Sequence, residues 1–161
     1  MIFVTIGSMF PFDRMIRAMD AWAAAEAGGE EILAQVGAGD YEPRHMTWVR
    51  KLDRPAYGAA IRRCRLVVAH AGVGSIVTAG ELRRPIVVLP RRAHLGEHTS
   101  DHQVETVGWL RAKSWVHVAD DEGALPACIA AAAAAAHAGA RLAPTADPGL
   151  IERLRHFIQH G

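Results

Sequence analysis

Short apolar runs alternate along this chain with longer amphipathic segments, and glycine or proline separates most of them. The short runs have the length and composition of strands that are buried on both faces of a parallel sheet. The amphipathic segments repeat apolar residues at the three- and four-residue spacing of helices. This alternation predicts an α/β fold, a Rossmann-like open parallel sheet with helices on both faces. The expected strands are 2–6, 31–36, 47–52, 66–69, 86–89 and 115–118, and the expected helices are 11–25, 55–63, Ser75 onward, 101–113 and 120–137.

The last part of the chain also predicts helix. Because alanine is the strongest helix former, the alanine-rich run 130–136 is most simply a close-packed helix. A breaker-rich connector follows at 143–148, and 149–159 is a final amphipathic helix. That helix either packs on its own sheet or docks on a partner. The chain has 161 residues and no internal repeat, so we expect a single domain over 1–161.

Composition limits the classes of protein that fit. Half of the residues are hydrophobic and 22% are charged, as in ordinary soluble domains. The formal net charge is only +1, which argues against nucleic acid as a partner. Cys64 and Cys128 are isolated, which is typical of a reducing compartment and not of a disulfide scaffold. Residues 1–6 lack a basic leader and are too short for a signal peptide or a membrane span, so we expect a cytoplasmic protein.

Candidate chemistry is concentrated between residues 66 and 103. The buried strand 66–69 leads into the turn His70-Ala71-Gly72-Val73-Gly74-Ser75, whose glycines permit a tight turn and close approach of a ligand. We expect Ser75 to cap the next helix, whose N-terminus favours an anion, most often a phosphate. The next strand stops at Pro90, before a loop rich in ionisable side chains. Two adjacent strand ends with polar loops form the usual ligand crevice of an open α/β sheet.

These motifs resemble the C-terminal, donor-binding half of GT-B glycosyltransferases, specifically the family 28 C-terminal domain. The family pattern is H-A-G-x-G-[ST] after a core strand, a strand that ends in proline, and a loop that ends in His-Gln or Asp-Gln. Here those elements are 70–75, 86–90 and 102–103. The resemblance covers roughly residues 1–120. It is closer to the small subunits of two-component transferases, namely the dolichol-linked N-acetylglucosaminyltransferase and the bacterial exopolysaccharide glucuronosyltransferases. Gly7-Ser8 and residues 11–14 also resemble the N-terminal loop of the exopolysaccharide branch.

The resemblance implies a donor-binding site. The turn's backbone N–H groups and the Ser75 hydroxyl would hold a diphosphate, Arg91 or Arg92 would add positive charge, and the Gln103 amide would read sugar hydroxyls. Thr78 stands where many members have a glutamate for the ribose, and it offers one hydroxyl where a carboxylate accepts two hydrogen bonds. The expected donor-binding residues are Gly7, Ser8, His70, Gly72, Val73, Gly74, Ser75, Thr78, Arg91, Arg92, His98, Asp101, His102 and Gln103.

Alternatives stay open at several of these positions. The glycine turn is otherwise a plain strand-to-helix connection, and His70 is otherwise a buried, hydrogen-bonded histidine. His98 and Asp101 either contact the ligand or only order their loop, while Gln103 is otherwise a solvent-facing residue in the first turn of a helix. His94, His98 and His102 are spaced four apart, but Gly96 interrupts the helix that a metal site would need, so no metal is expected.

The implied protein is the donor-binding subunit of an inverting, metal-independent glycosyltransferase in exopolysaccharide synthesis. Its substrate is a UDP-sugar, with glucuronate favoured and N-acetylglucosamine, glucose and galactose open, and no cofactor is expected. The acceptor is a lipid-linked saccharide. A membrane-anchored partner subunit would supply the acceptor-binding half and the catalytic base, and would hold the protein at the inner face of the membrane. The alternatives are a non-catalytic nucleotide-binding regulatory module and a nucleotide-sugar epimerase-like enzyme.

Overall fold

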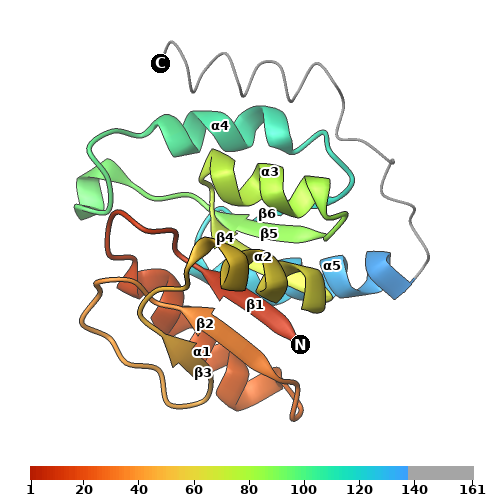
Figure 1. Ribbon diagram of the computed structural model, residues 1–161. Helices are drawn as coiled ribbons and strands as arrows, with labels where there is room; N and C mark the ends of the chain where they lie inside the picture. The colour runs from red at the N-terminus through yellow and green to blue at the C-terminus, as the bar shows by residue number, and fades with distance from the viewer. Residues whose placement is uncertain (138–161) are drawn as a thin grey trace.

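The computed structural model describes residues 1–137, which form a six-stranded, fully parallel sheet with helices on both faces (Figure 1). The strand order is β3-β2-β1-β4-β5-β6, so the first strand lies inside the sheet. On one side of it Ile2 pairs with Ile32, and on the other with Leu66. The strands are β1 Ile2–Thr5, β2 Ile32–Gln35, β3 Thr47–Val49, β4 Leu66–His70, β5 Ile86–Leu89 and β6 Val116–Val118.

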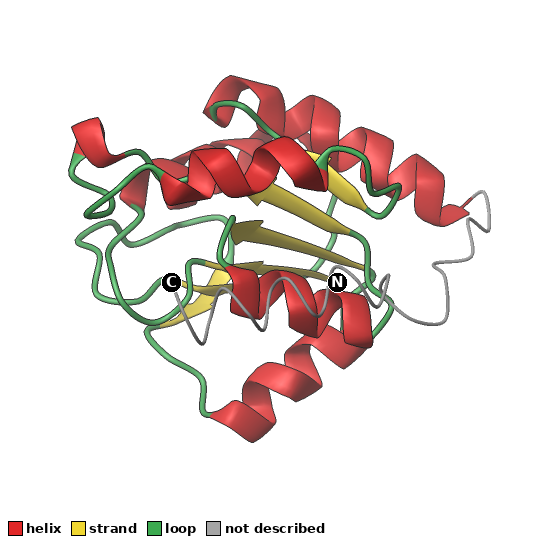
Figure 2. Ribbon diagram, turned by 90° about the horizontal axis from the view of Figure 1, so that it is seen from above, coloured by secondary structure: helices red, strands yellow, loops and turns green. Residues whose placement is uncertain are grey.

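Helices cover the two faces of the sheet in separate layers (Figure 2). Because alternate residues of a strand point to opposite faces, Ile2 and Val4 pack towards α1 and α5, whereas Phe3 packs towards α2, α3 and α4. Each face therefore has its own hydrophobic core. The helices are α1 Asp13–Glu26, α2 Arg54–Arg63, α3 Val73–Glu81, α4 His102–Leu110 and α5 Leu125–His137, with short 3-10 turns η1 Ala93–Leu95 and η2 Glu122–Ala124.

The expected fold class is confirmed, and every strand and helix expected within residues 1–137 is present. Boundaries differ by a few residues: β3 ends at Val49, and α4 covers a shorter stretch than 101–113. Asp53 caps α2 by accepting a hydrogen bond from the main-chain N–H of Ala56 at 2.8 Å. The connector 143–148 and the expected helix 149–159 lie outside the described residues.

No helix within residues 1–137 combines the length and the apolar character that crossing a membrane requires.

Candidate functional site

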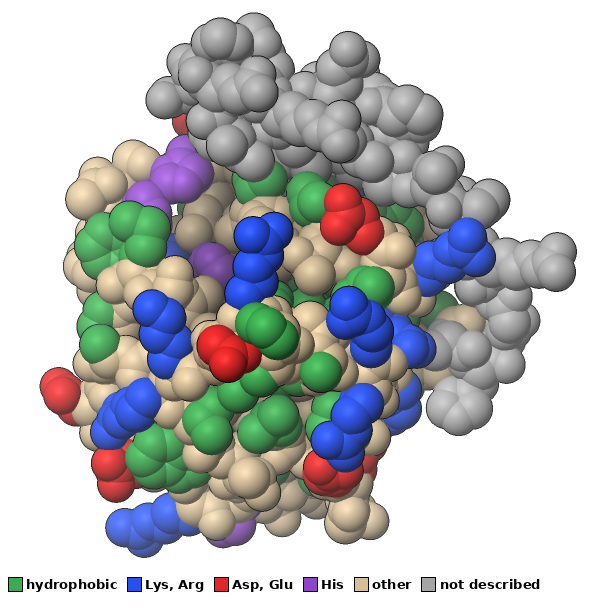
Figure 3. Space-filling view, in the orientation of Figure 1, with side chains coloured by type: hydrophobic (Ala, Val, Ile, Leu, Met, Phe, Trp, Pro, Cys, Tyr) green, Lys and Arg blue, Asp and Glu red, His purple; other side chains and the backbone are tan. Residues whose placement is uncertain are grey.

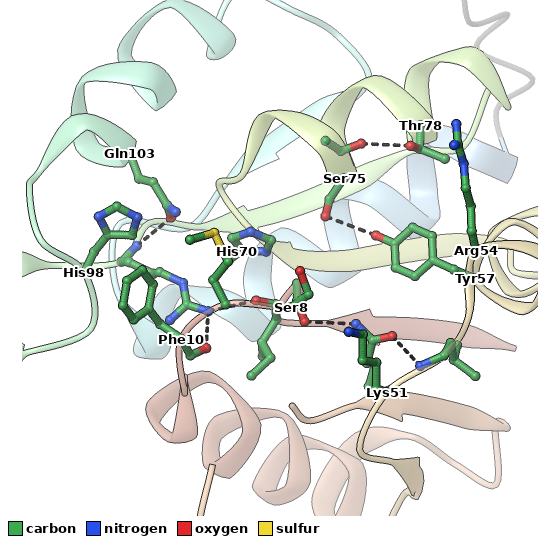
Figure 4. A pocket seen from close by; sticks show the side chains of 17 residues that line it. Ser8, Phe10, Lys51, Arg54, Tyr57, His70, Ser75, Thr78, His98 and Gln103 are labelled. Atoms are coloured by element: carbon green, nitrogen blue, oxygen red, sulfur yellow. Dashed lines mark hydrogen bonds between the residues drawn. The ribbon is translucent and has the colours of Figure 1, made fainter. Parts of the chain in front are cut away.

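A cavity of about 460 Å³ opens at the carboxyl edge of the sheet, where β1, β2, β4 and β5 end. Figure 3 shows a hollow on one face of the molecule, with histidine side chains beside it and within it. The cavity walls come from the connections β1–α1, β3–α2 and β5–α4, from the ends of β2 and β4, and from the N-terminal parts of α2, α3 and α4 (Figure 4). Its lining residues are Ile6, Gly7, Ser8, Met9, Phe10, Gln35, Lys51, Leu52, Arg54, Tyr57, His70, Gly74, Ser75, Thr78, Arg91, His98 and Gln103.

The N-terminus of α3 forms one wall. The first N–H groups of a helix have no partner within the helix, and the helix dipole adds positive potential there, so this wall suits an anion. The expectation that Ser75 caps this helix is wrong, because the cap is Gly72 and Ser75 lies within the first turn. The Ser75 hydroxyl instead shares a hydrogen bond of 3.1 Å with the Tyr57 hydroxyl of α2.

His70 fills the floor of the cavity between two glycines. A Cβ built on Gly72 would lie 2.1 Å from His70 Nε2, and one built on Gly7 would lie 2.7 Å from His70 Cε1. Both positions therefore need glycine for the imidazole to fit. Gly7 also has a φ of +77°, which L side chains rarely adopt.

The His70 imidazole is neutral at neutral pH. Burial, and secondarily the positive charge of Arg91, lowers the pKa of His70 to about 4, with a smaller opposite effect from the Thr5 main chain. His70 Nδ1 is buried without a hydrogen-bond partner in residues 1–137.

Arg91 reaches the cavity, but its guanidinium is already engaged. It is 2% exposed and donates hydrogen bonds to the main-chain oxygens of Ile6 at 2.8 Å, Phe10 at 2.7 Å, Pro11 at 2.5 Å and Glu97 at 3.1 Å. Burial lowers the pKa of Arg91 to about 10, which leaves the side chain charged at neutral pH. Arg91 therefore adds positive potential from beneath the cavity and ties two loops together.

Five residues expected in the site lie outside the cavity lining, namely Gly72, Val73, Arg92, Asp101 and His102. The Arg92 guanidinium donates to the main-chain oxygen of Asp120 at 2.7 Å. The Asp101 carboxylate accepts a hydrogen bond from the main-chain N–H of Ala93 at 2.8 Å, so it orders the loop. The ring of His102 packs edge-on against that of His98, with the ring centroids 4.4 Å apart. The expected ligand contacts of Arg92, Asp101 and His102 therefore have no support from this geometry.

Gln103, His98 and Phe10 form the opposite end of the cavity from Thr78 and Arg54 (Figure 4). Gln103 is 4% exposed, and its side-chain oxygen accepts a hydrogen bond from the main-chain N–H of Arg91 at 3.1 Å. The His98 ring lies against Phe10, with the ring centroids 5.1 Å apart. Burial and the nearby positive groups lower the pKa of His98. Gln103 and His98 thus line the cavity, as expected.

The sequence interpretation missed the wall formed by β2, the segment after β3, and α2. Lys51, Arg54 and Tyr57 line this wall together with Gln35. Gln35 was detectable, because it is a polar side chain at the end of an otherwise apolar strand. Both groups of the Gln35 amide are hydrogen-bonded. Its NH₂ group donates to the Gly7 main-chain oxygen at 2.9 Å, and its oxygen accepts from the Leu52 N–H at 2.9 Å.

The charge of the lining has one sign. Lys51, Arg54 and Arg91 are its basic side chains, and among residues 1–137 no aspartate or glutamate lines the cavity. The whole chain has a formal net charge of only +1, so the basic lining contrasts with the near balance of charges in the chain as a whole. Within residues 1–137 no three histidine, cysteine or acidic side chains are grouped to hold a metal ion.

Comparison with known proteins agrees with this fold. The chain has a TM-score of 0.62 with the crystal structure of the glycotransferase of kitacinnamycin, at 18% identity over 96% of this chain and 39% of that one. A structure of EarP-mediated arginine glycosylation of translation elongation factor EF-P aligns at a TM-score of 0.46 and 16% identity, over 99% of this chain and 61% of that one. The chain thus spans less than two thirds of either protein.

No curated protein sequence matches the chain. The model of the glycosyltransferase family 28 C-terminal domain, however, matches residues 1–119, which is most of the chain. The chain therefore belongs to the glycosyltransferase family 28 C-terminal domain family.

Proposed function

We propose that this chain binds the donor, a UDP-sugar, for an inverting, metal-independent glycosyl transfer. One observation carries the proposal: a cavity at a helix N-terminus whose lining, among residues 1–137, contains Lys51, Arg54 and Arg91 and no acidic side chain. A departing nucleoside diphosphate carries negative charge that a transferase must neutralise, and oriented N–H groups with cationic side chains do this without a metal.

The positions of the side chains support an orientation for the donor. The diphosphate lies at the N–H groups of Gly74 and Ser75, in the part of the cavity that His70 also lines. The ribose lies towards Thr78, and the sugar lies towards Gln103 and His98 at the other end (Figure 4). Glucuronate stays the favoured sugar from the sequence resemblance, with N-acetylglucosamine, glucose and galactose as the other candidates.

The proposed transfer needs a second polypeptide. The acceptor hydroxyl must lose a proton to a base, and carboxylates and histidines usually serve. Among residues 1–137 the lining has no carboxylate, and the pKa of each of its two histidines, His70 and His98, is lowered, to about 4 for His70, which makes both weaker bases. We assign the base, and the binding of a lipid-linked saccharide, to a membrane-anchored partner that keeps this chain at the cytoplasmic membrane face in exopolysaccharide synthesis.

Calorimetry with UDP and the four UDP-sugars tests the donor site. Lys51→Ala removes a cation from the lining, and loss of one charged hydrogen bond weakens binding by about tenfold or more. Lys113→Ala, which removes the same side chain outside the cavity, leaves the affinity unchanged. Binding by none of the five nucleotides would overturn the donor site.

A transfer assay tests the need for a partner. The expected result is incorporation of labelled sugar into lipid only when this chain and the membrane-anchored partner are combined. Full transfer by this chain alone would contradict the two-subunit arrangement. Nucleotide binding without transfer in the reconstituted pair would instead favour a regulatory nucleotide-binding module.

A further inference from the structure

Two hydroxyl groups meet where the first turns of two helices approach the cavity. Tyr57 lies in the first turn of α2 and Ser75 in the first turn of α3, and their hydroxyl oxygens are 3.1 Å apart. Both residues line the cavity (Figure 4). Ser75 is 6% exposed, and within residues 1–137 neither hydroxyl has another hydrogen-bond partner. The pair therefore lies beside the place proposed for the diphosphate.

The Ser75 hydroxyl does not use the partner that its own helix offers. A serine or threonine in a helix commonly donates to the main-chain oxygen three or four residues earlier. On the same helix Thr78 does so, with the Gly74 oxygen at 2.8 Å. For Ser75 those oxygens belong to Ala71 and Gly72, yet its hydroxyl faces Tyr57 of another helix. The orientation of the Ser75 side chain is therefore set from outside α3.

Tyr57 is a rigid support for this orientation. Its ring packs edge-on against Phe3, with the ring centroids 5.4 Å apart and the ring planes at 78°. Phe3 is fully buried in β1, which lies inside the sheet. The Tyr57 main-chain N–H donates to the Asp53 oxygen at 2.9 Å, which fixes the residue in α2. Because the Ser75 side chain turns about a single bond, the fixed phenol selects its rotamer.

The number of hydroxyl hydrogens determines what the pair can bind. Two hydroxyl groups carry two hydrogens, and one of these lies between the two oxygens. A phenol is a stronger hydrogen-bond donor than an aliphatic alcohol, so Tyr57 donates to Ser75 and the Ser75 hydrogen stays free. Accepting a hydrogen bond also polarises the Ser75 O–H group and strengthens its own donation. A diphosphate oxygen, which accepts hydrogen bonds, is the matching partner.

We infer that Tyr57 is a positioning residue of the diphosphate site, whose hydroxyl holds Ser75 in the orientation that presents its O–H hydrogen to a phosphate oxygen. The inference rests on the proposed function and goes beyond it, because Tyr57 lies outside the glycine turn and acts on the donor only through Ser75.

Tyr57→Phe tests the inference, because it removes the hydroxyl and keeps the ring against Phe3. The other tyrosine of the chain provides a matched control: the Tyr41 hydroxyl donates to Asp20 at 2.7 Å, outside the cavity lining. We expect Tyr57→Phe to weaken UDP binding in calorimetry by about three- to tenfold. Tyr41→Phe should lower the unfolding free energy and leave the UDP affinity unchanged. An unchanged UDP affinity in Tyr57→Phe would overturn the inference.

A double-mutant cycle with Ser75→Ala separates positioning from direct contact. If Tyr57 acts through Ser75, Tyr57→Phe should have no further effect on UDP affinity in the Ser75→Ala background. Additive losses would mean that Tyr57 contacts the donor itself, and the inference would be wrong. If the wild-type protein binds none of the nucleotides, the proposed function fails instead, so the two failures are distinguishable.

The ratio of UDP-glucose affinity to UDP affinity identifies the part of the donor that is involved. Because the pair acts on the diphosphate, which both nucleotides contain, Tyr57→Phe should leave this ratio unchanged. A loss confined to UDP-glucose would place the effect at the sugar and refute the inference.

NMR without any nucleotide provides a readout that a purely structural role would not change. The three-bond couplings that report the Ser75 side-chain rotamer should indicate one rotamer in the wild-type protein and an average of several in Tyr57→Phe. If Tyr57 only held α2 against α3, its loss would lower the unfolding free energy and leave these couplings as they are. Unchanged couplings would therefore contradict the positioning role.

Discussion

Two alanine substitutions in the same glycine turn should have opposite effects on stability. At Gly72 the added Cβ would lie 2.1 Å from Nε2 and 2.7 Å from Cδ2 of His70. The same ring also lies close to Gly7, where a Cβ would be 2.7 Å from Cε1 and 2.9 Å from Nε2 of His70. At Gly74 a Cβ has no heavy atom within 4 Å. The two positions therefore differ in what the new methyl group meets.

The expected magnitudes follow from these contacts. Overpacking a tightly packed site typically costs about 1–3 kcal/mol of unfolding free energy. The φ of Gly72 is −84°, which alanine adopts freely, so backbone strain adds nothing. Gly74 lies in the first turn of α3, where alanine raises helix propensity by up to about 1 kcal/mol. We expect Gly72→Ala to be destabilising and Gly74→Ala to be neutral or stabilising.

Urea denaturation of both variants measures the difference, and a double-mutant cycle identifies its cause. The same Gly72→Ala change in a His70→Ala background should cost little, because the atoms it would strike are gone. If Gly72→Ala costs the same in both backgrounds, the contact with the imidazole is not the cause. If Gly72→Ala and Gly74→Ala are equally tolerated, the description of the cavity floor is wrong.

Two further predictions concern buried ionisable groups. The pKa of His70 is about 4 in the folded protein and 6.5 ordinarily, so between these pH values the unfolded chain binds more protons. The unfolding free energy is therefore highest above pH 6.5 and falls by about 3 kcal/mol as the pH drops towards 4. An NMR titration of the His70 ring should show a midpoint near 4, and a midpoint near 6.5 would contradict the burial of the neutral ring. Asp20, on α1, accepts hydrogen bonds from the Tyr41 hydroxyl at 2.7 Å and from the His45 N–H at 2.7 Å, so Asp20→Ala should lower the unfolding free energy by on the order of 2–3 kcal/mol. Thermal denaturation checks this value, with the exposed Asp40→Ala as the control that should change it little.

The fold was predictable because its signal is local. Each buried strand is a short apolar run, and turn residues separate the strands from the helices, so periodicity alone indicated the parallel sheet. The glycine turn at 70–75 was predictable for the same reason. The capping residue of α3 was not predictable. Serine is a common N-cap residue, but α3 already begins at Val73, two residues before Ser75. Its hydroxyl faces Tyr57, a partner from another helix that no local pattern reveals.

The remaining part of the site depends on which side chains turn inwards after a strand ends. Arg91 and Arg92 are adjacent and chemically identical, yet Arg91 is buried under the cavity and Arg92 lies outside its lining. Lys51 and Arg54 reach the cavity only because β2 and β3 lie on the far side of β1 from β4. The strand order becomes known only from the folded sheet. Without it, the sequence gives no reason to place Lys51 and Arg54 anywhere but on an ordinary surface loop.

The interior position of β1 has a consequence for synthesis of the protein. Ile2–Thr5 is made before β4, one of its two neighbours in the sheet, which ends only at His70. Translation adds about 5–20 residues per second, so this apolar segment waits for several seconds before its second partner exists. The centre of the sheet therefore cannot close until β4 has been made, and non-local pairing of this kind folds slowly. During that interval Ile2–Thr5 is an unpaired apolar strand, the kind of segment that chaperones of nascent chains bind.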